Sequence, residues 1–297
     1  MGLARAQFSK PSTLFSPAKI GFGIRRVERV KLLAGWRQSF PVSDVNAIEI
    51  PLPPLPEQKR IVKILDEVFE GIAKAKENTE KNLRNSRELF ESYLQSVFEN
   101  TGEGWEEKTL AEIADIEYGF TAKARAEGDF RYIRITDIDK DGNLETGNKM
   151  FIKRTEESEH FILHDEDLLL ARTGASYGDV LFYRDVEPSV FASYLIRIKF
   201  TEKIANRFYW YFSKSKMYWD QAKKLSSGSA QPQFNGGALK QVVFVYPSSQ
   251  STQRSLIERL DKLFNETKKL EEIYRKKLED LDELKKSVLK KAFSGEL

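Results

Sequence analysis

One segment of the chain occurs twice, and this repeat constrains the fold more than any other feature. Residues 50–69 (IPLPPLPEQKRIVKILDEVF) align with residues 245–264 (VYPSSQSTQRSLIERLDKLF) at an offset of 195 positions, without a gap. The same register holds for about fifty positions, and its identical pairs include Gln58 with Gln253, Asp66 with Asp261, Phe69 with Phe264 and Leu89 with Leu284. Solenoid repeats have periods of about 20 to 50 residues. The sequence therefore predicts a duplicated linker and helix with a domain between the copies.

The repeat divides the 297 residues into four predicted parts. Residues 1–47 precede the first copy, which comprises a linker and a long helix at residues 48–103. An intervening domain is expected at residues 104–247, and the second linker and helix at residues 248–297. Long, highly charged helices beside a strand-rich domain predict an α+β protein.

Each predicted helix carries an apolar stripe with a seven-residue rhythm. Steps of three and four place such side chains on one face, which needs a partner to cover it. The predicted coiled-coil interface comprises Val68, Ile72, Ala75 and Leu89 in the first helix and Leu263, Leu270, Leu281, Leu284 and Val288 in the second. Antiparallel pairing would set Val68 opposite Val288 and Ile72 opposite Leu284. The alternative is two amphipathic helices that pack separately onto globular domains.

The intervening domain is expected to contain strands followed by a helix. Its β-rich segments YIRITDI, DLLLAR and FASYLIRIKF alternate with turns that contain Gly and Asp. An aromatic helix is predicted from about Ala205 to Leu225. These elements predict one mixed, strand-rich domain.

Two polar loops of this domain are candidate binding sites. The loop ARTGASYG at residues 171–178 offers donors from Arg172, Thr173, Ser176 and Tyr177, and the loop SSGSAQPQFN at residues 226–235 offers Ser227, Ser229 and Gln231. Such side chains can contact phosphates or base edges. Neither loop contains the Gly-Lys-Ser/Thr ending of a P-loop, so each could equally be an ordinary surface loop.

The net charge of +3 conceals an uneven distribution of charge. Residues 197–240 contain 9 Lys/Arg and 2 Asp/Glu, whereas residues 104–196 contain 11 Lys/Arg and 20 Asp/Glu. Residues 1–47 are also basic, with 8 Lys/Arg and 2 Asp/Glu. Both basic segments come just before a copy of the repeat. They indicate a surface that attracts phosphate, or a solvated basic helix face.

Composition and motifs exclude several other classes of protein. No apolar run approaches the roughly 18 residues of a membrane span. The absence of cysteine excludes disulfides and thiolate zinc sites and favours the cytoplasm. The segment DIDKDGNLETGN at residues 137–148 resembles a calcium loop but ends in Asn148, which favours a hairpin turn. His160 and His164 lack a third ligand, so a surface pair is expected and no metal site is predicted.

The chain resembles the specificity (S) subunits of type I DNA restriction-modification systems. The resemblance rests on IPLPPLPEQKRI before a long helix, DEDLLLARTGASYG, SSGSAQPQF and the ending KKAFSGEL, and it covers nearly all of the chain from residue 48. It implies two target-recognition domains that alternate with two helices in an antiparallel coiled coil. Residues 1–47 would then be the remnant C-terminal part of a first recognition domain, because a complete one needs roughly 150 residues.

The resemblance implies a non-catalytic subunit that recognises double-stranded DNA. Partner modification (methyltransferase) subunits would bind S-adenosylmethionine, and a further restriction subunit would cleave, so no catalytic residue and no cofactor is expected in this chain. The candidate DNA contacts are the loop residues named above, with Lys123, Arg125, Lys223 and Lys224 on phosphates. A shortened subunit could act as a homodimer. The alternatives are an inactive fragment that serves as a recombination reservoir, or a coiled-coil structural or interaction protein.

Overall fold

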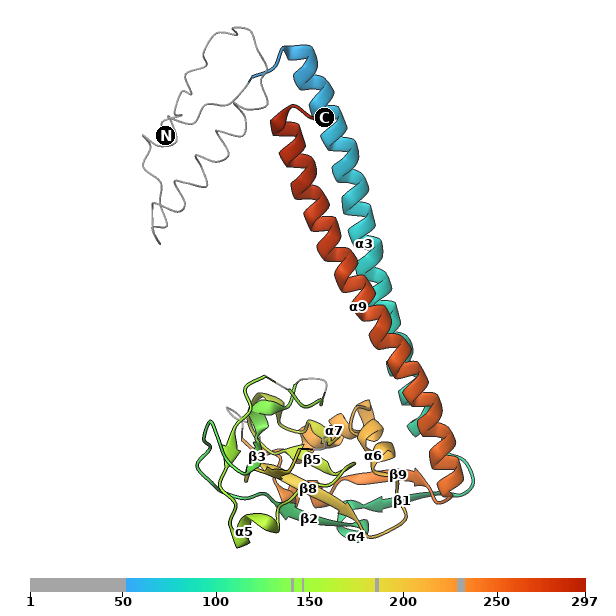
Figure 1. Ribbon diagram of the computed structural model, residues 1–297. Helices are drawn as coiled ribbons and strands as arrows, with labels where there is room; N and C mark the ends of the chain where they lie inside the picture. Colours follow the sequence, from blue (N-terminus) through green and yellow to red (C-terminus); the bar gives the residue numbers. More distant parts are fainter. Residues whose placement is uncertain (1–51, 140–141, 146, 185–186, 229–232) are drawn as a thin grey trace. The chain divides into compact units, whose positions relative to one another are not determined.

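Two helices of equal length begin and end the main described part of the chain (Figure 1). The computed structural model describes residues 52–139, 142–145, 147–184, 187–228 and 233–297. Helix α3 spans Leu55–Glu99 and helix α9 spans Gln250–Ser294, with 45 residues each. The described chain divides into two compact units: a helical unit of residues 52–85 and 269–297, and a globular unit of residues 86–268. The expected remnant at residues 1–47 lies outside the described residues.

The helical unit is an antiparallel pair, as the sequence predicts (Figure 1). Residues with rising numbers along α3 contact residues with falling numbers along α9. Arg60 donates to the main-chain oxygen of Leu297, Lys285 lies over the ring of Phe69 with Nζ 5.2 Å from its centroid, and Lys76 pairs with Asp282. These contacts join the ends and the middle of the two helical segments, so the register is continuous.

The residues of the predicted interface are buried to different degrees. Ile72 is buried, and Val68, Ala75, Leu263, Leu281 and Val288 are half-buried. The predictions for Leu89, Leu270 and Leu284 are wrong, since these side chains are 61%, 40% and 48% exposed. Phe90 and Glu271 are buried at the adjacent positions. A strict seven-residue repeat assumes 3.5 residues per turn, whereas a straight helix has 3.6. The buried stripe of a straight helix therefore drifts away from the seven-residue positions by about 20° per heptad.

The globular unit contains three sheets, two antiparallel and one mixed, whose strands are interleaved along the chain. The four-stranded sheet has the order β2 (Ala114–Tyr118), β8 (Leu195–Phe200), β5 (Leu168–Ala171) and β6 (Val180–Phe182), and all its neighbours are antiparallel. A three-stranded sheet contains β4 (Phe151–Ile152), β3 (Phe130–Ile133) and β7 (Ser189–Phe191). Strands β1 (Trp105–Thr109) and β9 (Val243–Pro247) pair antiparallel with Trp105 opposite Pro247. The first and last strands of the domain are therefore neighbours.

Short helices complete the globular unit. They are α4 (Leu110–Ile113), α5 (Glu156–Glu159), α6 (Asn206–Phe212), α7 (Lys216–Leu225) and α8 (Gly236–Lys240), with 3-10 turns η1 (Ile135–Asp137) and η2 (Gly174–Ser176). The single helix expected from Ala205 to Leu225 is thus two helices. Ser215 caps α7 by accepting a hydrogen bond from the Tyr218 amide at 3.2 Å, which ends the α6 register. The segment FASYLIRIKF likewise divides between β7 and β8.

Aromatic side chains of α6 form much of the main core. Phe208, Tyr209, Tyr211 and Phe212 are fully buried, together with Tyr218 of α7. Burial raises the pKa values of Tyr209 and Tyr218 far above the usual range of a phenol. These hydroxyls therefore stay neutral and are core groups rather than acids or bases.

The acidic turn and the histidines agree with the simpler interpretations. Ile138 and Leu144 form an antiparallel bridge, and Asp139 Oδ1 accepts from the Asn143 amide at 2.8 Å, as in a hairpin turn. His160 and His164 are exposed. Within the described residues, no group of three His, Asp or Glu side chains could hold a metal ion. None of the described helices has the length and apolar character that a membrane span requires.

Candidate nucleic-acid interface

The two polar loops predicted from the sequence lie next to each other. Thr173 and Gln233 form an antiparallel bridge, and the Phe234 amide donates to the Arg172 carbonyl at 2.8 Å. Gln233 also exchanges two main-chain hydrogen bonds with Ser227, at 2.8 and 3.1 Å. Segments more than fifty positions apart in the sequence thus make one surface. We call residues 172–178 with residues 226–228 and 233–235 the two-loop surface.

The guanidinium of Arg172, in the first of these loops, lies over two tyrosine rings. Its guanidinium carbon lies 5.4 Å from the ring centroid of Tyr118 and 5.1 Å from that of Tyr194. Both tyrosines are unusually open for large side chains, with 42% and 53% of their surface exposed. Cation–π contacts of this kind hold a guanidinium in place while leaving its positive charge intact. We call Tyr118, Arg172 and Tyr194 the tyrosine–arginine cluster.

No carboxylate neutralises Arg172 among the described residues. Its Nε atom is buried and has no hydrogen-bond partner in that part of the chain. Other arginines of the domain differ: Arg197 donates to Glu117 at 2.6 Å, and Arg134 to Asp137 at 2.7 Å. A fixed guanidinium with free donors suits phosphate oxygens or the O6 and N7 atoms of guanine.

Neighbouring strands and glycines set the geometry of the tyrosine–arginine cluster. Tyr118 ends β2, and its hydroxyl accepts a hydrogen bond from the Gly236 amide at 2.8 Å. A Cβ atom at Gly236 would lie 2.9 Å from that hydroxyl oxygen, so a side chain there would displace Tyr118. Gly178, with a φ of 85°, closes the first loop against Trp219, and a Cβ there would lie 3.1 Å from the indole. Both glycines allow close approach of the backbone.

The remaining predicted contacts are distributed around this surface. Ser176 and Tyr177 are half-buried, and Tyr177 packs edge to face on Trp219 of α7 with centroids 6.1 Å apart. Lys223 and Lys224 are exposed in the last turn of α7. Lys123 and Arg125 are exposed on the segment after β2, and within the described residues no hydrogen bond joins them to the two-loop surface. Ser229 and Gln231 lie outside the described residues.

The sequence pattern did not indicate Tyr118 or Tyr194. Each lies at the end of a strand whose alternation predicts core, and nothing in the spacing links them to Arg172. Their pairing arises from the ladder in which β8 lies between β2 and β5, which places Tyr118 opposite Ile196 and Ala171 opposite Leu195. The available signal was the position of each tyrosine beside a loop rather than in mid-strand.

Comparison with protein families places this surface in a known context. Residues 25–83 and 102–280 match the family model of the type I restriction modification DNA specificity domain. The chain belongs to this family. The match includes most of both helices and the whole of the two-loop surface, so the family resemblance extends beyond the helical repeat.

Curated relatives carry the same description. The chain is 27% identical over 271 residues to the type I restriction enzyme MjaVIII specificity subunit of Methanocaldococcus jannaschii, and 25% identical over 314 aligned positions to the StySPI specificity subunit of Salmonella potsdam. These alignments cover 84% and 98% of the chain. The chain spans 62% and 66% of the length of these relatives, which is less than two thirds.

Solved structures share the fold. A chain from a study of complex assembly and conformational transition of a type I R-M system aligns with a TM-score of 0.77 at 20% identity, covering 93% of this chain and 69% of that one. The HsdS subunit from Thermoanaerobacter tengcongensis aligns with a TM-score of 0.57 at 20% identity, covering 95% and 71%. At this identity the likeness establishes the fold, including the α+β class and the paired helices.

Proposed function

We propose that the chain is the DNA-recognition (specificity) subunit of a type I restriction-modification complex. The observation that carries this proposal is Arg172, held between Tyr118 and Tyr194 with no carboxylate partner among the described residues, on a surface made by two polar loops. Membership of the DNA specificity family supports the same function. Residues 104–247 are the target-recognition domain in this proposal, and the two linkers and helices are its conserved scaffold.

The subunit would position DNA by phosphate contacts and read it by base contacts. Lys123, Arg125, Lys223 and Lys224 are exposed cations suited to phosphates. Arg172 and the hydroxyl and amide side chains of the two loops are suited to base edges, with Thr173, Ser176, Tyr177, Ser227, Ser229 and Gln231 as further candidates. The half-buried positions of Thr173 and Ser176 support contacts close to the loop backbone.

The chemistry would belong to partner proteins rather than to this chain. A base must leave the duplex before it can be methylated, and the two-loop surface offers hydrogen-bond donors and a cation that suit binding. We assign methylation to modification subunits and cleavage to a restriction subunit, both directed to the site by this chain in the cytoplasm. Neither a cofactor nor a metal is required of the chain itself.

The decisive experiment co-expresses the chain with its modification subunit and maps methylated adenines across the host genome. A defined motif in cells with the wild-type chain, and its loss with Arg172→Gln, is the expected result. Arg184→Gln is the matched control, because Arg184 also lies over an aromatic ring, Phe182, but is paired with Asp165 and Glu166 at 3.1 Å. Absence of any motif would indicate an inactive fragment. An unchanged motif with Arg172→Gln would exclude the tyrosine–arginine cluster as the recognition site.

A further inference from the structure

The surface of α9 that meets α6 has an equivalent on α3. The α9 docking surface comprises Gln253, Ile257, Leu260, Asp261 and Phe264. Arg207 of α6 donates to Asp261 Oδ1 from Nε at 3.0 Å and from Nη2 at 2.8 Å, and the Tyr211 hydroxyl donates to the same oxygen. Phe264 packs on Trp210 with ring centroids 5.5 Å apart. An arginine with aromatic residues three and four positions later therefore covers this surface.

The internal repeat gives α3 the same residues at four of these five positions, with Val62 in place of Ile257. At the offset of 195, the α3 docking surface comprises Gln58, Val62, Leu65, Asp66 and Phe69. Gln253 and Leu260 are 1% and 0% exposed, whereas Gln58 and Leu65 are only half-buried and Val62 is 54% exposed. The two surfaces are alike in composition, but within the described residues no helix equivalent to α6 covers the one on α3, where Lys285 of α9 lies over Phe69.

Both glutamines donate to a proline carbonyl that precedes their helix, but their remaining hydrogen bonds differ. Gln58 Nε2 donates to the Pro53 carbonyl, five positions earlier, at 2.7 Å, and Gln253 Nε2 donates to the Pro247 carbonyl, six positions earlier, at 2.8 Å. Gln253 Oε1 also accepts from the Ala205 amide at 2.8 Å, at the entry to α6. Among the described residues, no donor reaches Gln58 Oε1. Each glutamine therefore donates to the segment before its helix, but only on α3 does the Oε1 acceptor have no donor among the described residues.

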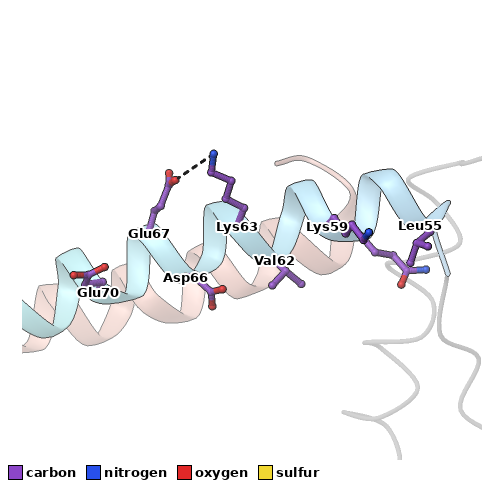
Figure 2. A pocket seen from close by; sticks show the side chains of 8 residues that line it. Leu55, Lys59, Val62, Lys63, Asp66, Glu67 and Glu70 are labelled. Carbon is purple, nitrogen blue, oxygen red and sulfur yellow. Dashed lines mark ion pairs between the residues drawn. The ribbon is translucent and has the colours of Figure 1, made fainter.

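Charge on this face of α3 is complementary to an arginine. A shallow depression along the helix is lined by apolar and amide side chains, by two lysines and by three carboxylates, namely Leu55, Gln58, Val62, Lys59, Lys63, Asp66, Glu67 and Glu70 (Figure 2). Lys63 pairs with Glu67 at 3.9 Å, but Asp66 has no ion pair among the described residues. An unpaired carboxylate thus stands at the position where Asp261 receives Arg207.

We infer that the α3 docking surface binds a helix of a second polypeptide with the chemistry of α6, namely an arginine followed three and four residues later by tryptophan and tyrosine or similar aromatic residues. Such a helix would be presented by another recognition-type domain. The arginine would donate to Asp66, a ring would pack on Phe69, and a main-chain amide would donate to Gln58 Oε1. The chain would thereby carry two docking surfaces of the same kind.

The probe is a fluorescent peptide of residues 203–215, made helical by a hydrocarbon staple that replaces Ala205 and Tyr209. By the 3.6-residue period these two positions lie opposite Arg207 and Tyr211. Fluorescence anisotropy measures its binding to the full chain in the absence of DNA, so the result is independent of the proposed function. Saturable binding is expected, and Asp66→Arg in the chain should weaken it about tenfold or more, as loss of a docked charge pair does.

Matched variants make the result specific. Arg207→Asp in the peptide should also weaken binding, and combining it with Asp66→Arg should restore affinity through the reversed ion pair. Glu77→Lys, an exposed change elsewhere on α3, should have little effect. Absence of saturable binding, or equal losses with Asp66→Arg and Glu77→Lys, would overturn the inference. Binding that occurs only after deletion of residues 1–51 would assign the surface to this chain's own N-terminal segment and would also overturn it.

Discussion

Phe90 of α3 meets Phe264 of α9 edge to face, with ring centroids 5.4 Å apart. Trp210 and Tyr211 of α6 contact the same Phe264 ring, at 5.5 and 6.3 Å between centroids. One side chain thus joins both long helices to the aromatic core of the globular unit. Its repeat equivalent, Phe69, has the ammonium of Lys285 over its ring.

Phe264→Ala should therefore destabilise the protein more than Phe69→Ala. We expect a loss of about 2 to 4 kcal/mol in the free energy of unfolding for Phe264→Ala, because a partly buried aromatic ring leaves a cavity. Phe69→Ala should cost about 1 kcal/mol, since fewer rings surround it. Urea denaturation followed by circular dichroism measures both. Equal losses would show that the two copies of the repeat are packed alike.

Gln253 and Gln58 provide a second matched pair. Gln253→Ala removes hydrogen bonds to the Pro247 and Lys203 carbonyls and to the Ala205 amide. Leaving such buried groups unpaired should cost about 1 to 3 kcal/mol. Gln58→Ala removes one bond at a half-buried position and should cost less than about 1 kcal/mol. A thermal melt in which Gln58→Ala lowers the midpoint as much as Gln253→Ala would contradict this expectation.

Arg172→Gln should weaken binding to DNA that contains the target motif about tenfold or more at low salt. Its guanidinium has no competing carboxylate among the described residues, so its charge is available. If Arg172 contacts a phosphate, the slope of log affinity against log salt should decrease by about 0.9. If it reads a base, discrimination at one position of the motif should fall by about 1 to 3 kcal/mol. Titrations at several salt concentrations separate the two cases, with Arg184→Gln as the control.

The ion pair between Lys76 and Asp282 should depend on pH. The hydrogen bond from Lys76 lowers the pKa of the Asp282 carboxyl below its ordinary value of 3.8. Because the folded pKa is depressed, the stabilisation is present above pH 4 and is lost as the pH falls through the folded value. A carboxyl NMR titration should show the Asp282 pKa returning toward its ordinary value in Lys76→Met. An unchanged pKa would mean that the pair does not form in solution.

The long helices and their antiparallel pairing were predictable because the apolar rhythm and the repeat both report on local structure. The detailed interface was less so: a seven-residue repeat places Leu89 and Leu270 inside, whereas the 3.6-residue helix buries Phe90 and Glu271 instead. The polar loops were identified from their residue types. Their contact through Thr173 and Gln233, and the tyrosines around Arg172, depend on how distant strands pair, and one sequence contains no signal for that pairing.

The pairing of β1 with β9 has a consequence for how such chains can change. Because Trp105 stands opposite Pro247, the chain enters and leaves the domain on two adjacent, paired strands. A different sequence could replace the residues between β1 and β9 while these two strands, and the helices that precede and follow them, stay in place. New binding preferences could therefore be acquired by exchanging the whole domain, with the helices unchanged, as long as the new domain keeps the side chains of α6 that contact Asp261 and Phe264 of α9.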